Sequence, residues 1–94
     1  MASIGLRVED RLDGGGNWTS WRARIVLLME EYELWEIVET VVVVPTDPTL
    51  LVEFKKKNIK AKRIILDLVK DHIIPHVSGR RFAYQMSKSL NNLY

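Results

Sequence analysis

Apolar residues recur every three or four positions in several separate stretches of the chain, which is the spacing of one face of an α-helix. Asn17 precedes the first of these stretches, and its short polar side chain is of the type favoured at a helix N-cap. The pattern predicts a first helix from about Trp18 to Glu31. The residues of its apolar face are Trp18, Trp21, Ile25, Leu28 and Tyr32.

The pattern changes twice in the following segment. Residues 34–38 read Leu-Trp-Glu-Ile-Val, which predicts a brief second helix of one or two turns. Thr40 to Val44 is a threonine followed by four valines, a run with strong β propensity that Pro45 ends. We expect a short extended piece or a packed loop here. An unpaired run of this kind could also add to a strand from a peptide or from another subunit.

Two longer helices are predicted in the second half of the chain. Asp47 and Pro48 are typical of an N-cap and a first helical position, and no Gly or Pro interrupts residues 49–74 before Pro75. Ser78 is the expected N-cap of the last helix. The apolar face of the third helix carries Leu51, Phe54, Ala61, Ile64, Ile65 and Leu68, and that of the last helix carries Phe82, Met86, Leu90 and Leu93.

These elements predict an all-α fold, a small domain of four helices around one core, with room for one extra short helix. Residues 17–94 are expected to form this helical domain. Residues 1–16 are expected to form a flexible N-terminal arm, because the three consecutive glycines at 14–16 disfavour regular structure. The expected core contains Trp21, Ile25, Leu28, Trp35, Phe54, Ala61, Ile65, Leu68, Phe82 and Leu90.

Composition narrows the choice of function. The chain has no cysteine, which removes disulfides and thiolate metal sites and fits a reducing compartment, so a cytoplasmic location is expected. Its net charge of only +2 gives no general argument for a nucleic-acid partner. No apolar run approaches the length of a membrane span, so no membrane partner is expected.

Local clusters of basic residues still deserve a functional interpretation. On the third helix, Lys56, Lys60, Arg63 and Lys70 are predicted to lie near one another, opposite the apolar face, where they could contact the phosphates of RNA. No aromatic residue is interleaved to stack on bases, so a solvated helix face is the favoured interpretation.

Residues with catalytic or ligand-binding chemistry are few. His72 and His76 are four positions apart, but Pro75 lies between them and no third metal ligand follows at a regular spacing. No serine is placed against either histidine as a nucleophile would need. The three tryptophans could line a ligand pocket, although their spacing is better explained by core packing. We therefore expect no enzyme activity, metal, cofactor or small-molecule substrate.

The ordered set of aromatic and apolar residues resembles the N-terminal region of copia-type retrotransposon Gag proteins. That family has Asn-Tyr-x-x-Trp before a helix, then Leu-Trp-x-x-Val, and later helices with characteristic Ala, Ile, Leu, Met and Tyr positions. The matching residues span about positions 12 to 94, with Trp18 in place of Tyr, Phe54 of Trp, Asn58 of Asp and Ser87 of Trp. The signature residues expected in the core are Trp18, Trp21, Leu34, Trp35, Phe54, Ala61, Ile65, Leu68, Leu90 and Tyr94.

The resemblance implies a capsid-N-terminal-like domain, a non-catalytic building block that binds other copies of itself in a particle that packages the element's RNA. The family's Cys-Cys-His-Cys zinc knuckle has no counterpart in this sequence. Two alternatives are a domesticated Gag-derived adaptor that binds a host peptide and a basic helical module that binds RNA directly. The residues expected to mediate self-association are Val41, Val42, Val43, Val44 and Met86.

Overall fold

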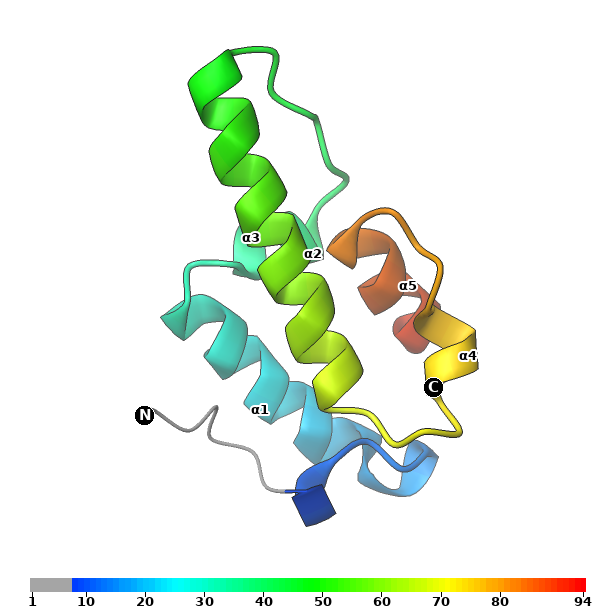
Figure 1. Ribbon diagram of the computed structural model, residues 1–94. Helices are drawn as coiled ribbons and strands as arrows, with labels where there is room; N and C mark the ends of the chain where they lie inside the picture. The colour runs from blue at the N-terminus through cyan, green and yellow to red at the C-terminus, as the bar shows by residue number, and fades with distance from the viewer. Residues whose placement is uncertain (1–7) are drawn as a thin grey trace.

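The helical patterns of the sequence become helices in the computed structural model, which describes residues 8–94 (Figure 1). Within this range there is no β-strand, so the all-α prediction is confirmed. No helix in it is long and apolar enough to cross a membrane. The elements are two short 3₁₀ helices, η1 (Val8–Asp10) and η2 (Gly15–Asn17), and the helices α1 (Trp18–Glu31), α2 (Trp35–Glu39), α3 (Pro48–Asp67), α4 (Ile74–Val77) and α5 (Ala83–Leu93).

Helix α3 begins as predicted but ends seven residues early. The Asp47 carboxylate accepts hydrogen bonds from the backbone N–H groups of Thr49 and Leu50 (2.9 and 3.1 Å), and Pro48 is the first helical residue. At the other end, the Leu68 carbonyl accepts the indole N–H of Trp21 at 2.8 Å. The backbone N–H of Leu12 donates to the same carbonyl at 2.9 Å, so this oxygen bonds residues from other parts of the chain instead of continuing the helix.

The last helix begins at Ala83, so the prediction of Ser78 as its N-cap is wrong. Ser78 ends α4, and Gly79 follows with a positive φ of 80°, a conformation that glycine adopts without strain. Pro75 lies in the first turn of α4, where its missing N–H costs no helical hydrogen bond. The Gln85 side-chain oxygen accepts from the backbone N–H groups of residues 81 and 82 and thereby caps α5 locally.

A buried side chain from α3 completes this cap. The Asn58 Oδ1 accepts the backbone N–H of Ala83 at 2.9 Å, and its Nδ2 donates to the Arg81 carbonyl at 3.1 Å. Asn58 is the one buried polar side chain in the described chain. It therefore joins the middle of α3 to the start of α5 through hydrogen bonds that span about 25 residues of sequence.

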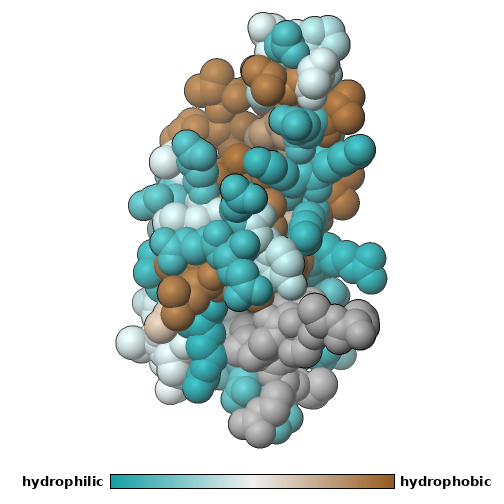
Figure 2. Space-filling model, turned by 90° about the vertical axis from the view of Figure 1, so that its left-hand side faces the viewer, coloured by the Kyte–Doolittle hydropathy of each residue, from teal (hydrophilic) through white to brown (hydrophobic). Residues whose placement is uncertain are grey.

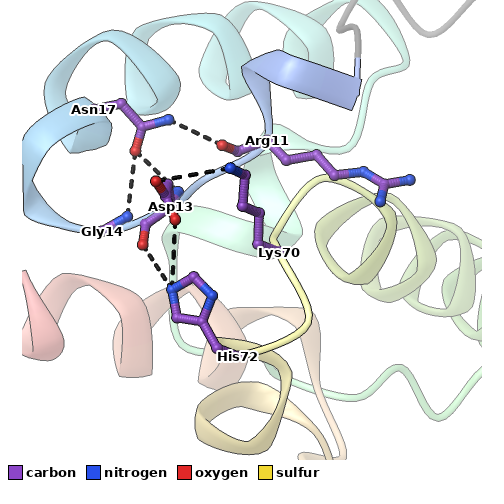
Figure 3. Close-up of polar contacts among 6 residues, drawn as sticks. All are labelled: Arg11, Asp13, Gly14, Asn17, Lys70 and His72. Atoms are coloured by element: carbon purple, nitrogen blue, oxygen red, sulfur yellow. Dashed lines mark hydrogen bonds and ion pairs between the residues drawn. The ribbon is translucent and has the colours of Figure 1, made fainter.

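The N-terminal segment differs from the predicted flexible arm. Residues 1–7 of that arm lie outside the described residues, but Leu12 is fully buried and forms an isolated parallel bridge with Val69. Behind it, the Asn17 side chain accepts from the backbone N–H groups of Asp13 and Gly14 and donates to the Arg11 carbonyl (Figure 3). Asn17 precedes α1 as predicted, yet its side chain folds the loop before the helix and makes no N-cap hydrogen bond.

The core lies where α1, α2, α5 and the second half of α3 meet. Of the ten predicted core residues, the three aromatic residues Trp35, Phe54 and Phe82 are only partly buried. The other seven are buried: Trp21, Ile25, Leu28, Ala61, Ile65, Leu68 and Leu90. Buried residues that the helical pattern did not predict include Leu12, Met29, Ile73 and Val77.

The first half of α3 extends beyond this core. Figure 1 shows it projecting at the top of the molecule, connected to α2 by the long loop over residues 40–47. None of residues 48–57 is buried, and only Leu51 and Phe54 among them are even partly buried. This projecting end places apolar side chains in solvent, and it is the part of the fold that a binding function can use.

Candidate self-association surface

Exposed apolar side chains gather at the projecting end of the molecule. Val43 is 87% exposed, and Leu50 is 54% exposed on the first turn of α3. Figure 2 shows hydrophobic side chains around this upper part, interspersed with hydrophilic ones. We call the exposed apolar side chains of the valine run and of the first turns of α3 the apolar projection; they are Val41, Val43, Val44, Leu50 and Val52.

The exposure of the side chains varies along the valine run, from the partly buried Val42 to Val44 at 40% and Val43 at 87%. Val41 and Val43 face solvent, whereas Val42 between them is partly buried. This is the alternation of an extended chain, in which successive side chains point to opposite sides. The Thr40 hydroxyl donates to the Glu36 carbonyl at 2.8 Å and ends α2 at the start of this run. The run forms part of the loop that joins α2 to α3, and it makes no paired strand among residues 8–94.

Met86 is a correction to the predicted surface. It is only 1% exposed, because it lies with Ala83 and Leu90 on the face of α5 that packs into the core. It cannot contact a second molecule while the domain is folded. Leu50 and Val52 join the surface instead. Val52 is an apolar residue on the polar face of the helix, which is a signal that the sequence carries. Leu50 lies on the same face as Phe54 and Ala61, and it is exposed because the first half of α3 extends beyond the core.

The four basic residues proposed for RNA contact do not form one free strip. The Lys60 ammonium lies 4.2 Å from the centre of the Tyr32 ring, and Arg63 lies 3.7 Å from the Asp67 carboxylate. Lys70 follows the end of α3, and its Nζ is 3.7 Å from the Asp13 carboxylate (Figure 3). Lys56 alone among the four has neither a carboxylate nor a ring partner in the described chain. A phosphate would therefore have to compete with intramolecular partners for three of these four side chains.

The two histidines are used separately. His72 lies in the turn before α4, and its Nε2 is 2.7 Å from the Asp13 carbonyl oxygen, a hydrogen bond that requires the proton on Nε2 (Figure 3). His76 is exposed on α4 itself. Among residues 8–94, no three His, Asp or Glu side chains gather as a metal ion would require. The contact of His72 fixes the N-terminal segment to the turn after α3.

The tryptophans divide between the core and an open groove. Trp21 is buried, and the Trp18 ring stacks on it with 5.7 Å between the ring centres. Trp18 also makes a tilted ring contact with Tyr94 at 5.5 Å, which joins the first helix to residue 94. Trp35 is partly buried beside an open groove of ≈ 170 Å³ between α1, α2 and α5. Ser87 lines the same groove, at the position where the family that this chain resembles has a tryptophan. A small residue there leaves the groove unfilled.

The remaining family-signature residues lie mostly inside the fold. Trp18, Trp35 and Phe54 are partly buried, and Tyr94 is exposed apart from its contact with Trp18. The buried ones are Trp21, Leu34, Ala61, Ile65, Leu68 and Leu90.

No protein-family model, curated protein or solved structure matches this chain.

Proposed function

We propose that this chain is a Gag-like capsid domain of the copia retrotransposon type, a non-catalytic unit that binds copies of itself in a cytoplasmic particle that packages RNA. The observation that carries the proposal is the apolar projection. Five apolar side chains, each at least 40% exposed, lie close in sequence, along the loop before α3 and on its first turns, in a domain whose core is otherwise well packed. Apolar surface concentrated in this way is typical of a protein interface, because burying it against a partner removes it from water.

Three polar side chains that could have formed a reaction centre have structural roles instead. Asn58 caps α5, Asn17 folds the loop before α1, and His72 holds the Asp13 carbonyl. Each of these side chains forms hydrogen bonds with backbone atoms of the domain itself. The function of the domain is therefore binding through its surface and not catalysis.

The test is analytical ultracentrifugation over a concentration series with three variants. Val43→Asp places a charge on the exposed apolar projection, so it should shift the protein to monomer while the helical circular dichroism is unchanged. Val42→Asp should mainly lower the thermal stability, because Val42 is partly buried. Leu27→Asp is the matched control: it changes an exposed apolar residue on α1, outside the projection, and should leave the mass distribution as in the wild type.

Two results would overturn the proposal. One is a wild-type domain that remains monomeric at a protein concentration of roughly 500 μM, at which even weakly bound specific complexes form. The other is equal loss of association in the Val43→Asp and Leu27→Asp variants, which would indicate nonspecific apolar contact.

A second candidate is an adaptor function, in which the groove beside Ser87 binds a peptide from another protein. The groove combines the apolar Trp35 and Val38 with the polar Arg22 and Asn91, as peptide-binding grooves do. Ser87→Trp would fill this groove without changing the apolar projection. An adaptor would lose its peptide partner in that variant, whereas a self-associating domain would keep its mass distribution.

A further inference from the structure

Charge is strongly segregated between two neighbouring parts of the chain. Residues 25–54 contain seven acidic residues and no lysine or arginine, whereas residues 55–63 contain six basic residues and no acidic one. The helices turn this division into two surfaces. One, the glutamate surface, is formed by Glu30, Glu31, Glu33, Glu36 and Glu39 at the end of α1 and along α2. The other is the outward side of the projecting half of α3.

The two surfaces do not neutralise each other within the molecule. All five glutamates are exposed, and so are Lys55, Lys56 and Lys57. The ion pairs within residues 8–94 join Asp67 to Arg63 and Asp13 to Lys70 and His72, so none of them joins the glutamate surface to α3. Two opposite and unpaired charged surfaces therefore remain on each copy of the domain.

The charges of each surface also destabilise the helices that carry them. Glu30 and Glu31 are the last two residues of α1, and Glu39 is the last residue of α2, so they place negative charge at helix ends that already carry a partial negative charge. On α3, Lys56 and Lys60 repel each other one turn apart. Contact with a surface of opposite charge would relieve both penalties.

The α3 surface also carries apolar side chains among its lysines. Val52 and Ile59 are 53% and 65% exposed, and they lie seven residues apart, which places them on one side of the helix two turns from each other. Lys56 lies between them on the same side. We call Val52, Lys55, Lys56 and Ile59 the basic face; Val52 makes it continuous with the apolar projection.

We propose that the domain associates head to tail, with the basic face of one copy packed on the glutamate surface of the next. The inference rests on the self-association proposed above and specifies which surfaces meet. A second copy fits as the occupant because the chain itself presents the complementary charge. A contact between two different surfaces leaves one of each free at the ends of every open assembly, so copies add in one direction. They form a closed ring where the rotation between copies closes and an open filament where it does not.

The test reverses one charge on each surface. Lys56→Glu and Glu31→Lys should each weaken self-association about tenfold or more, because each brings like charges together in the contact. Neither should lower the melting temperature, since each removes an unfavourable charge from its own helix. An equimolar mixture of the two variants should associate again, and so should a chain that carries both changes. Arg80→Glu and Asp71→Lys are exposed controls outside both surfaces and should associate as the wild type does.

The outcomes separate this inference from the proposed function. If the wild type is monomeric, self-association itself fails. If the wild type associates but neither reversal weakens it, or the mixture fails to restore what each reversal loses, the head-to-tail contact is wrong and self-association stands. If Lys56→Glu leaves the mass unchanged but abolishes binding to a single-stranded RNA homopolymer, the basic face binds RNA and the inference is overturned.

Discussion

The two halves of α3 have the same helical backbone but opposite surroundings. Residues 58–67 contain all four buried residues of the helix, Asn58, Ala61, Ile64 and Ile65, whereas residues 48–57 contain none. The second half is held by the core. The first half is held by the Asp47 cap and by continuity with the second half, so local signals are enough to extend a helix that tertiary packing has already nucleated. The comparison shows how one helix can serve both the fold and a surface.

Matched leucine substitutions give the largest expected difference between the two ends. Leu68→Ala, at the end that packs into the core, should lower the free energy of unfolding by about 2–5 kcal/mol, because it leaves a cavity. Leu50→Ala, on the projecting end, should lower it by less than about 0.5 kcal/mol, because the side chain is already largely in water. Chemical denaturation of both variants measures the difference. Similar losses for the two would mean that the projecting end is packed in solution.

Asn58, the first residue of the buried half, links α3 to the start of α5. Asn58→Leu should lower the free energy of unfolding by about 1–3 kcal/mol, because the Ala83 N–H and the Arg81 carbonyl lose their partner. Asn58→Asp is the informative control. Its carboxylate keeps an acceptor for the Ala83 N–H at the start of α5, where negative charge is favourable, so it should lose less than the leucine variant. The order of the two variants in chemical denaturation tests whether capping of α5 is the role of this side chain.

The sequence predicts those parts of the fold that short-range signals determine. The bounds of α1 follow from the periodicity of its apolar residues, and the Asp47–Pro48 start of α3 follows from capping chemistry within a few residues. The structure confirms both. The end of α3 could not be predicted in this way. It depends on the hydrogen bond from Trp21 to the Leu68 carbonyl, between residues 47 positions apart, and on the pairing of Leu12 with Val69.

The same distinction applies to the candidate surface. The alternation of an extended valine run is a local property, so it predicts that neighbouring valines face opposite sides, as Val42 and Val43 do. Which side faces solvent depends on where α3 lies, which only the tertiary structure gives. Met86 fails for that reason: its helical face was predicted correctly, but that face is covered by the core.

The groove beside Ser87, between α1, α2 and α5, is not filled by side chains, and a larger residue at position 87 can fill it. Ser87→Trp should raise the free energy of unfolding by about 1 kcal/mol, because an indole there can cover the partly buried Trp35. Thr19→Trp, at an exposed position on α1, adds the same side chain without a groove to fill and should give no gain. Thermal unfolding of both variants measures this. A loss of stability in Ser87→Trp would mean that the groove does not admit the ring.

The smallest expected effect concerns the projecting half of α3, where stability depends on local electrostatics and not on packing. Lys56→Glu replaces a repulsion with Lys60 by an attraction, with the acidic residue one turn before the basic one, the favourable order on a helix. The melting temperature at a concentration where the protein is monomeric should rise by about 1–3 °C. Lys88→Glu is the matched reversal on α5. It has Tyr84 and Asn92 four residues away, and the change removes the contact of the Lys88 ammonium with the Tyr84 ring, so it should bring no gain. Raising the salt from about 50 mM to about 500 mM should remove most of the increase for Lys56→Glu, because exposed charges are screened within a few ångströms at the higher value. An increase that persists at high salt would show that Lys56 constrains α3 through packing, and the contrast between the two halves of the helix would then be smaller than the burial pattern indicates.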